Sequence, residues 1–209
     1  MVGILAAGLL RPVGAGAQAP PPCLLLPLAP AERVAAATLI VEAQVLDARG
    51  EWDTGHQHIY TRQRLRVFRV LKGSLPDTTA LPLLVEGGQV GLQRQELTNT
   101  LRPLATGQQG LFFLVPAPWP GVAPAWVAYA SSQGVITYNL AANTAAEPAR
   151  TYATPAAAAA ETTQLSGQPP LVLRPNLALT AAQLRVVQAA QRSQAPVISS
   201  FSPVQATAG

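Results

Sequence analysis

The chain has 209 residues, of which 49% are apolar, 11% charged and 5% aromatic. Its formal net charge is only +4, which is small for a nucleic-acid binder of this length, so no nucleic-acid partner is expected. Lys72 is the only lysine beside thirteen arginines, and a genome rich in G and C explains this bias together with the abundant alanine and the 20 prolines.

The first 19 residues are predicted to be a secretory signal peptide. Residues 2–10, VGILAAGLL, form an apolar run too short to span a bilayer, and residues 17–19, AQA, fit a small-residue cleavage site. Arg11 follows the apolar run, whereas signal peptides carry basic residues in front of it. The protein is therefore expected to be secreted or at the cell surface and not membrane-spanning. Cys23, the only cysteine, is interpreted as a surface thiol without a role.

Residues 20–36 are predicted to be a proline-rich lead-in with a short helix of about two turns that begins at Pro30. The pattern then changes to alternation in residues 38–47, TLIVEAQVLD. Leu39, Val41, Ala43 and Val45 share one face, and Glu42 and Gln44 share the other. This alternation predicts a half-buried strand.

The longest predicted strand covers residues 59–72, IYTRQRLRVFRVLK. Its two faces carry a basic row and an apolar row, namely Arg62, Arg64 and Arg66, and Leu65, Val67 and Leu71. Phe68 and Val70 then appear on the arginine face, so the strand either is covered on both sides or changes register at a bulge. A bent strand of this kind suits a small barrel.

Shorter strands are predicted at residues 81–85, 89–92 and 111–115, and the last of them, LFFLV, is the first choice for a central strand. Residues 126–129 and 135–138 are predicted to form a hairpin around SSQG. Short strands with no long helix between them predict a mainly β fold, a small antiparallel OB-like barrel or closed sheet over residues 37–145.

The remainder of the chain differs in composition. Residues 146–179 are interpreted as a low-complexity linker. Residues 180–193 are predicted to be a linker helix, because Thr180 with Gln183 makes a capping-box pattern and Leu184 with Val187 makes a narrow apolar stripe.

The two histidines of the chain are considered as a metal site. His56 and His58 can share a strand face, as zinc ligands do, but no third ligand stands at a diagnostic spacing, so a solvated hairpin loop is favoured. No serine has a nucleophile-elbow context, and the HExxH pattern is absent. We therefore expect no catalytic, cofactor-binding or metal-binding residues in this chain.

The arginine row is the candidate ligand contact. Arg62, Arg64 and Arg66 could bind acidic glycans or phosphates, although such a row is more often the solvated face of a strand. The glycine pairs at 87–88 and 107–110 lack the GxGxxG order and are interpreted as turns. Trp119 and Trp126 flank a proline-rich loop, which gives a weak indication of a contact patch.

Four stretches resemble a recurrent module of secreted bacterial proteins: ATLIVEAQVLDARGEW, YTRQRLRVFRVLKG, VEGGQVG and LATGQQGLFFLVPA. Over residues 37–140 the chain is similar to the five-stranded OB-type barrels of netrin-like and metalloproteinase-inhibitor-like domains. The resemblance implies a barrel and says almost nothing about a ligand. Inhibitor domains of this class depend on an N-terminal cysteine and disulfides, and this chain departs from them with Cys23 alone.

Residues 196–209, PVISSFSPVQATAG, resemble the opening of an IPT/TIG domain, an immunoglobulin-like β-sandwich. The positions that match its first-strand pattern are Pro196, Ile198, Phe201, Pro203 and Gly209. The resemblance implies the N-terminal region of a secreted bacterial protein of the type IX secretion kind, with a truncated IPT/TIG domain here and a C-terminal sorting domain last. A matrixin-like zinc metalloprotease domain or adhesive repeats can follow such a domain, which would place any enzyme beyond Gly209.

The resulting hypothesis is a non-catalytic N-terminal binding or structural module of an exported multidomain protein. One alternative is an accessory region of an extracellular zinc metallopeptidase whose catalytic domain lies beyond residue 209. Another is a module that binds acidic glycans or peptides through the arginine row. The expected partners are other domains of the parent chain or an extracellular glycan or protein.

Overall fold

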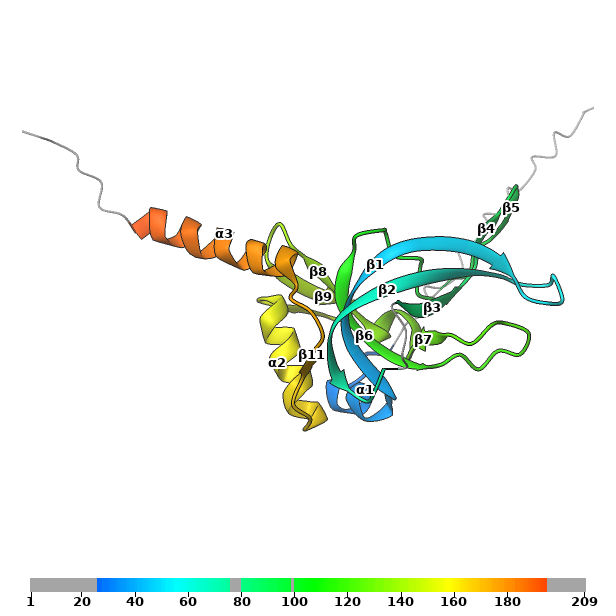
Figure 1. Cartoon of the computed structure of the whole chain (residues 1–209), viewed down its shortest axis with the longest axis horizontal. Helices are drawn as coiled ribbons and strands as arrows, with labels where there is room; N and C mark the ends of the chain where they lie inside the picture. The colour runs from blue at the N-terminus through cyan, green and yellow to red at the C-terminus, as the bar shows by residue number, and fades with distance from the viewer. Residues whose placement is uncertain (1–25, 76–79, 99, 195–209) are drawn as a thin grey trace, which may run out of the picture.

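The protein is described by a computed structural model that covers residues 26–75, 80–98 and 100–194. Its centre is a closed barrel of five strands, as predicted (Figure 1). These strands are β1 (Leu39–Trp52), β2 (Ile59–Lys72), β3 (Leu81–Glu86), β6 (Gln109–Pro116) and β7 (Trp126–Ala128). Around the barrel the order is β1-β2-β3-β7-β6, and β6 pairs again with β1. A closed ring of five strands in this order is an OB-like barrel.

The barrel interior is filled by alternate residues of β1 and β2. Leu39, Val41, Ala43 and Val45 are buried there, as the alternation in β1 predicted. β2 contributes both Val67 and Val70 to the same core, which strict alternation forbids. The pairing shifts register between Glu42 and Ala43, opposite Arg69 and Val67, so Phe68 is the extra residue. The predicted change of register at a bulge is confirmed.

A second core lies outside the barrel, where three helices cover its outer face (Figure 1). The helices are α1 (Pro30–Ala36), α2 (Pro155–Ser166) and α3 (Leu177–Gln194). Val34, Ala158 and Leu179 from these helices are buried in one cluster with Ile40 and Phe113, which face outward from β1 and β6. The barrel is therefore one half of a larger packed domain.

The other elements extend this arrangement. They are β4 (Gly88–Val90), β5 (Gln93–Gln95), the 3-10 turn η1 (Ser131–Gly134), β8 (Val135–Asn139), β9 (Thr144–Glu147), β10 (Arg150–Tyr152) and β11 (Leu171–Val172). β4 and β5 form a separate hairpin. β8, β9 and β10 continue the sheet beyond β6, and β11 pairs with the second half of β2.

The predicted hairpin between residues 126–129 and 135–138 is wrong. β7 and β8 lie end to end along one edge of β6, opposite Leu114–Pro116 and Gly110–Phe112 respectively. Between them, Ala130 and Ser131 have positive φ values of 52° and 59°, and η1 takes up the intervening residues. The apolar strand LFFLV, with a second partner in β1 on its other edge, offers more sheet pairing than a local hairpin would.

The interpretation of residues 146–179 as a linker is also wrong. Tyr152, Ala158 and Ala159 from this stretch are buried in the second core. Thr154 caps α2 by accepting a hydrogen bond from the backbone N–H of Ala157 at 3.0 Å, and Gly167 ends the helix with a φ of 65°. The alanines that make the stretch look low in complexity are the small side chains that let α2 approach the sheet closely.

The helix predicted at residues 180–193 begins earlier, at Leu177, because Asn176 caps it in place of Thr180. The side-chain oxygen of Asn176 accepts a hydrogen bond from the N–H of Leu179 at 3.2 Å. The residues that face the domain are Leu179 and Ala182, which are buried. The predicted signal peptide, Cys23 and the predicted IPT/TIG strand at 196–209 all lie outside the described residues.

Candidate binding site

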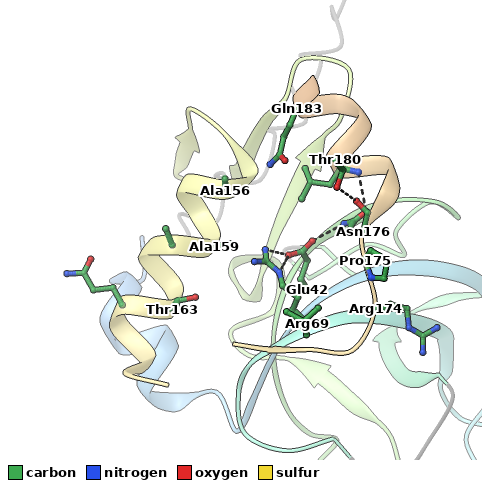
Figure 2. Close-up of a pocket in the computed structure, with 14 residues that line it drawn as sticks. Glu42, Arg69, Ala156, Ala159, Thr163, Arg174, Pro175, Asn176, Thr180 and Gln183 are labelled. Atoms are coloured by element: carbon green, nitrogen blue, oxygen red, sulfur yellow. Dashed lines mark hydrogen bonds and ion pairs between the residues drawn. The ribbon is translucent and has the colours of Figure 1, made fainter. Parts of the chain in front are cut away.

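A cavity of about 620 Å³ lies between α2, α3 and the outer face of β1 and β2. Small and polar side chains form its walls: Ala156, Ala159 and Thr163 of α2, and Thr180 and Gln183 of α3 (Figure 2). The strap, defined here as residues 172–176, runs from the end of β11 to α3 and forms another side of the cavity. Glu42 and Arg69 form the floor of the cavity.

Glu42 and Arg69 form an ion pair at the floor of the cavity. They are direct partners across β1 and β2, and the Arg69 Nε donates to Glu42 Oε2 at 2.6 Å. Glu42 is completely buried, whereas the Arg69 side chain is 31% exposed. A buried carboxylate is costly unless its charge is paired and its oxygens are hydrogen-bonded.

Asn176 supplies the second donor to Glu42. Its Nδ2 lies 2.8 Å from Glu42 Oε1 and 2.9 Å from the side-chain oxygen of Gln109 in β6 (Figure 2). One side chain therefore caps α3 and attaches the strap to two barrel strands. Both oxygens of the buried Glu42 carboxylate are therefore hydrogen-bonded by described side chains.

The hydroxyl of Tyr138 belongs to the same buried polar region. It has no hydrogen-bond partner among the described residues. Burial raises the pKa of Tyr138 well above its usual value, the negative charge of Glu42 raises it further, and Arg69 opposes this. The phenol is therefore neutral at physiological pH.

A second cavity, of about 360 Å³, borders the first at the strap and is called here the arginine notch. Arg66 lines it from β2 and Arg174 lines it from the strap, together with Gln44, Gln109 and the first residues of α3. Both arginine side chains are exposed, and neither forms an ion pair with a described residue. The notch therefore gathers two arginine charges that no carboxylate of the described residues pairs with.

The structure separates the members of the predicted arginine row. Arg62 is paired with Glu51, at 2.8 and 2.9 Å from its Nε, and Arg64 is paired with Asp47. The ion pair with Arg64 lowers the pKa of Asp47. Arg66 instead faces the neutral Gln44 across the strands. The role of Arg62, Arg64 and Arg66 as ligand contacts stays a prediction, but only Arg66 has a free charge.

His56 and His58 lie in the exposed loop between β1 and β2. Asp53 organises this loop, since its side-chain oxygen accepts hydrogen bonds from the backbone N–H groups of Gln57 and His58 at 2.7 and 3.3 Å. These bonds, the one from Gln57 foremost, lower the pKa of Asp53. Within the described part of the chain, no three His, Cys, Asp or Glu side chains are grouped so that they could hold a metal ion.

The glycine pairs lie in turns, and the two tryptophans pack in hydrophobic clusters. Gly87, Gly88 and Gly107 have positive φ values of 83°, 137° and 88°, which glycine adopts without strain. Trp119 packs on Tyr60 with ring centroids 5.2 Å apart, whereas Trp126 packs against the barrel core. The two tryptophans therefore join different clusters and anchor the loop between β6 and β7.

Sequence reasoning missed three residues of the two cavities. The alternation in residues 38–47 places Glu42 on the face opposite the apolar one, and the composition of residues 146–179 places Arg174 and Asn176 in a linker. A signal for Asn176 was present, because an asparagine directly before the apolar run LAL is a typical N-cap. No local pattern could show that this cap would also reach a carboxylate 134 residues earlier in the chain.

Comparison with known proteins adds no relative: no protein-family model matches the chain, and no curated protein is significantly similar to it. None of the helices in residues 26–194 that the structure describes is long and apolar enough to cross a bilayer.

Proposed function

We propose that this chain is a non-catalytic binding or structural module of an exported multidomain protein. The observation that carries the proposal is the course of α3. The first turns of this helix pack on the domain through Leu179 and Ala182, and its second half runs beyond the barrel and the other helices (Figure 1).

The projecting half of α3 carries apolar side chains that the domain leaves uncovered. Leu184, Val186 and Val187 are 56%, 44% and 52% exposed. Leu184 and Val187 are three residues apart and therefore lie side by side on one face of the helix, whereas Val186 lies on another face. Single exposed apolar residues are ordinary, but an exposed apolar pair on a projecting helix suits an interaction surface. We assign the covering role to the segment that follows α3 directly, residues 195–209, together with the domain that this segment begins.

The sequence of that segment supports the assignment. Val197, Ile198 and Phe201 are apolar residues that follow the end of α3 closely in sequence, and the resemblance to an IPT/TIG first strand suits a domain that packs beside its connector. The signal-peptide pattern of residues 1–19 supports export to the cell surface or the medium. In the cavities, the engaged state of Glu42 and the uncompensated charge of the arginine notch favour binding over catalysis.

The test of the docking step compares the 209-residue chain with one extended by the sequence that follows in the gene. Hydrogen exchange of residues 184–192 is expected to slow in the longer protein, because the following domain covers the apolar patch. Leu184→Gln with Val187→Gln should abolish this added protection, while Leu177→Gln, at the barrel end of α3 and 72% exposed, should leave it intact.

Two results would contradict the proposal. Equal exchange in the two proteins would show that nothing covers the helix, and a stop codon directly after Gly209 would remove the proposed domain. Export has its own readout: mass spectrometry of the protein secreted from a Gram-negative host should show cleavage after Ala19. A chain that stays in the cytoplasm with residues 1–19 attached would refute export.

A further inference from the structure

On the outer face of β1 and β2, three arginines of β2 form ion pairs with carboxylates of β1. Arg69, Arg64 and Arg62 of β2 are paired with Glu42, Asp47 and Glu51 of β1. At Arg66 the residue opposite is Gln44, whose amide has no charge. Of the four arginines of β2, Arg66 is therefore the one without an ion pair to a described residue, and Arg49 of β1, opposite Arg62, likewise has none.

Arg174 brings a second free guanidinium to the same place. The backbone N–H groups of Leu173 and Arg174 donate to the carbonyl oxygen of Phe68 at 2.9 and 3.2 Å. Pro175 restricts the backbone of the preceding residue, Arg174, and Asn176 is held by Glu42 and Gln109. The backbone of Arg174 is therefore fixed on both sides, so that its side chain and that of Arg66 line one notch.

The remaining lining suits a ligand with hydroxyl groups. The Gln44 amide nitrogen makes one long contact, 3.4 Å, to the carbonyl oxygen of Gly107, and no described hydrogen bond occupies its side-chain oxygen. That oxygen can accept a hydrogen bond from a hydroxyl. Guanidinium groups match the planar geometry of carboxylates and bind other oxyanions in the same two-pronged way.

We propose that the arginine notch binds an acidic sugar unit of a polysaccharide. Arg66 and Arg174 hold its carboxylate or sulfate group, and Gln44 accepts a hydrogen bond from a hydroxyl of the sugar. An acidic peptide would satisfy the arginines in the same way, so polyglutamate is the competing probe in the test. The site lies on the barrel, the strap and the first residues of α3, so this inference stands independently of export and of the docking of the second half of α3.

Binding of the full 209-residue chain to two probes, heparin for sulfate and alginate for carboxylate, tests the proposal. The double variant Arg66→Gln with Arg174→Gln should raise the dissociation constant by about tenfold or more, because two charge-assisted contacts are lost. The Gln44→Ala variant should weaken binding by a smaller factor. Binding to heparin alone would assign sulfate as the recognised group, and binding to alginate alone would assign carboxylate.

The matched control is the double variant Arg64→Gln with Arg94→Gln. It removes the same net charge, and both arginines are exposed but paired, with Asp47 and Glu96 respectively. Its dissociation constants should stay within about twofold of the unchanged chain, provided that both double variants keep the same melting temperature. Equal losses in the two variants would overturn the proposal in favour of general charge attraction. Failure to bind either polysaccharide would also overturn the proposal. This holds even if polyglutamate binds through Arg66 and Arg174, because the ligand would then be an acidic peptide.

Discussion

Arg33 in α1 and Glu147 in β9 form an ion pair across 114 residues of sequence, and their side chains are only 1% and 8% exposed. Arg33 also donates from Nη1 to the carbonyl oxygen of Gln133 at 2.8 Å, and its guanidinium lies 4.3 Å from the centroid of the Phe113 ring. The pair connects the first helix to the last part of the sheet, inside the second core.

Glu147→Gln should destabilise the protein by about 3–5 kcal/mol, because it leaves the buried charge of Arg33 without its partner. Urea denaturation gives the free energy of unfolding. Glu161→Gln is the control, since it breaks the Arg150–Glu161 pair, in which the side chains are 45% and 32% exposed, and should cost about 1 kcal/mol or less. Similar costs for the two variants would contradict the role given to burial.

The protein should lose stability at alkaline pH through the ionisation of Tyr152. Burial, followed by its hydrogen bond to Glu147 at 2.8 Å, raises the pKa of Tyr152 to about 12. A folded-state pKa above the unfolded value of about 10 gives stability that is fully present below pH 10 and is lost as the pH rises towards 12. Urea midpoints at about pH 9 and about pH 11.5 should therefore differ less in Tyr152→Phe than in the unchanged chain. The same pH dependence in both proteins would refute this account.

Asn176→Ala should loosen α3 more than Thr180→Ala does. Asn176 caps the helix and also donates to Glu42 and Gln109, whereas the Thr180 hydroxyl makes one exposed bond to the carbonyl oxygen of Asn176. Loss of a cap costs about 1 kcal/mol, and the unsatisfied oxygen of Glu42 adds to this. Hydrogen exchange of α3 amides measures the difference. A larger effect at Thr180 would favour the cap that the sequence predicted.

Gly50→Ala should disturb the contact between β1 and the β4–β5 hairpin. A Cβ at Gly50 would lie 1.9 Å from the carbonyl oxygen of Gln89, so the hairpin must move. The expected cost is about 1–3 kcal/mol. Gly55→Ala is the matched control, because its Cβ would meet nothing closer than 3.7 Å. Thermal unfolding of the two variants checks the prediction, and equal melting temperatures would contradict the close approach.

Much of the barrel could be predicted from periodicity. The alternation in residues 39–45 determined which side of β1 faces the interior, and the misplaced Phe68 and Val70 indicated the bulge in β2. These features are local, since each depends on residues within a few positions of one another. The hairpin after Trp126 failed because β6 attracts both neighbours as partners, which is a property of the whole sheet.

The candidate site was harder to predict because its parts come from distant segments. Glu42 alternates like an exposed residue, and only the strap, more than a hundred residues later, covers it. Composition was also misleading for α2, where alanines that resemble a flexible linker pack tightly in the second core. The arginine row was visible in sequence, but the carboxylates that neutralise Arg62 and Arg64 depend on the pairing register of β1 and β2.

The contact between Asn176 and Glu42 bears on how the protein folds while it is being made. β1 leaves the ribosome early, but the second donor to its buried carboxylate arrives only after residue 176 has been synthesised. Until then the outer face of the barrel lacks both the strap and α3, so the nascent barrel should remain only partly stable. A shorter chain ending near residue 145 would keep this unfinished state permanently, and the smallest independent folding unit therefore extends to the first turns of α3.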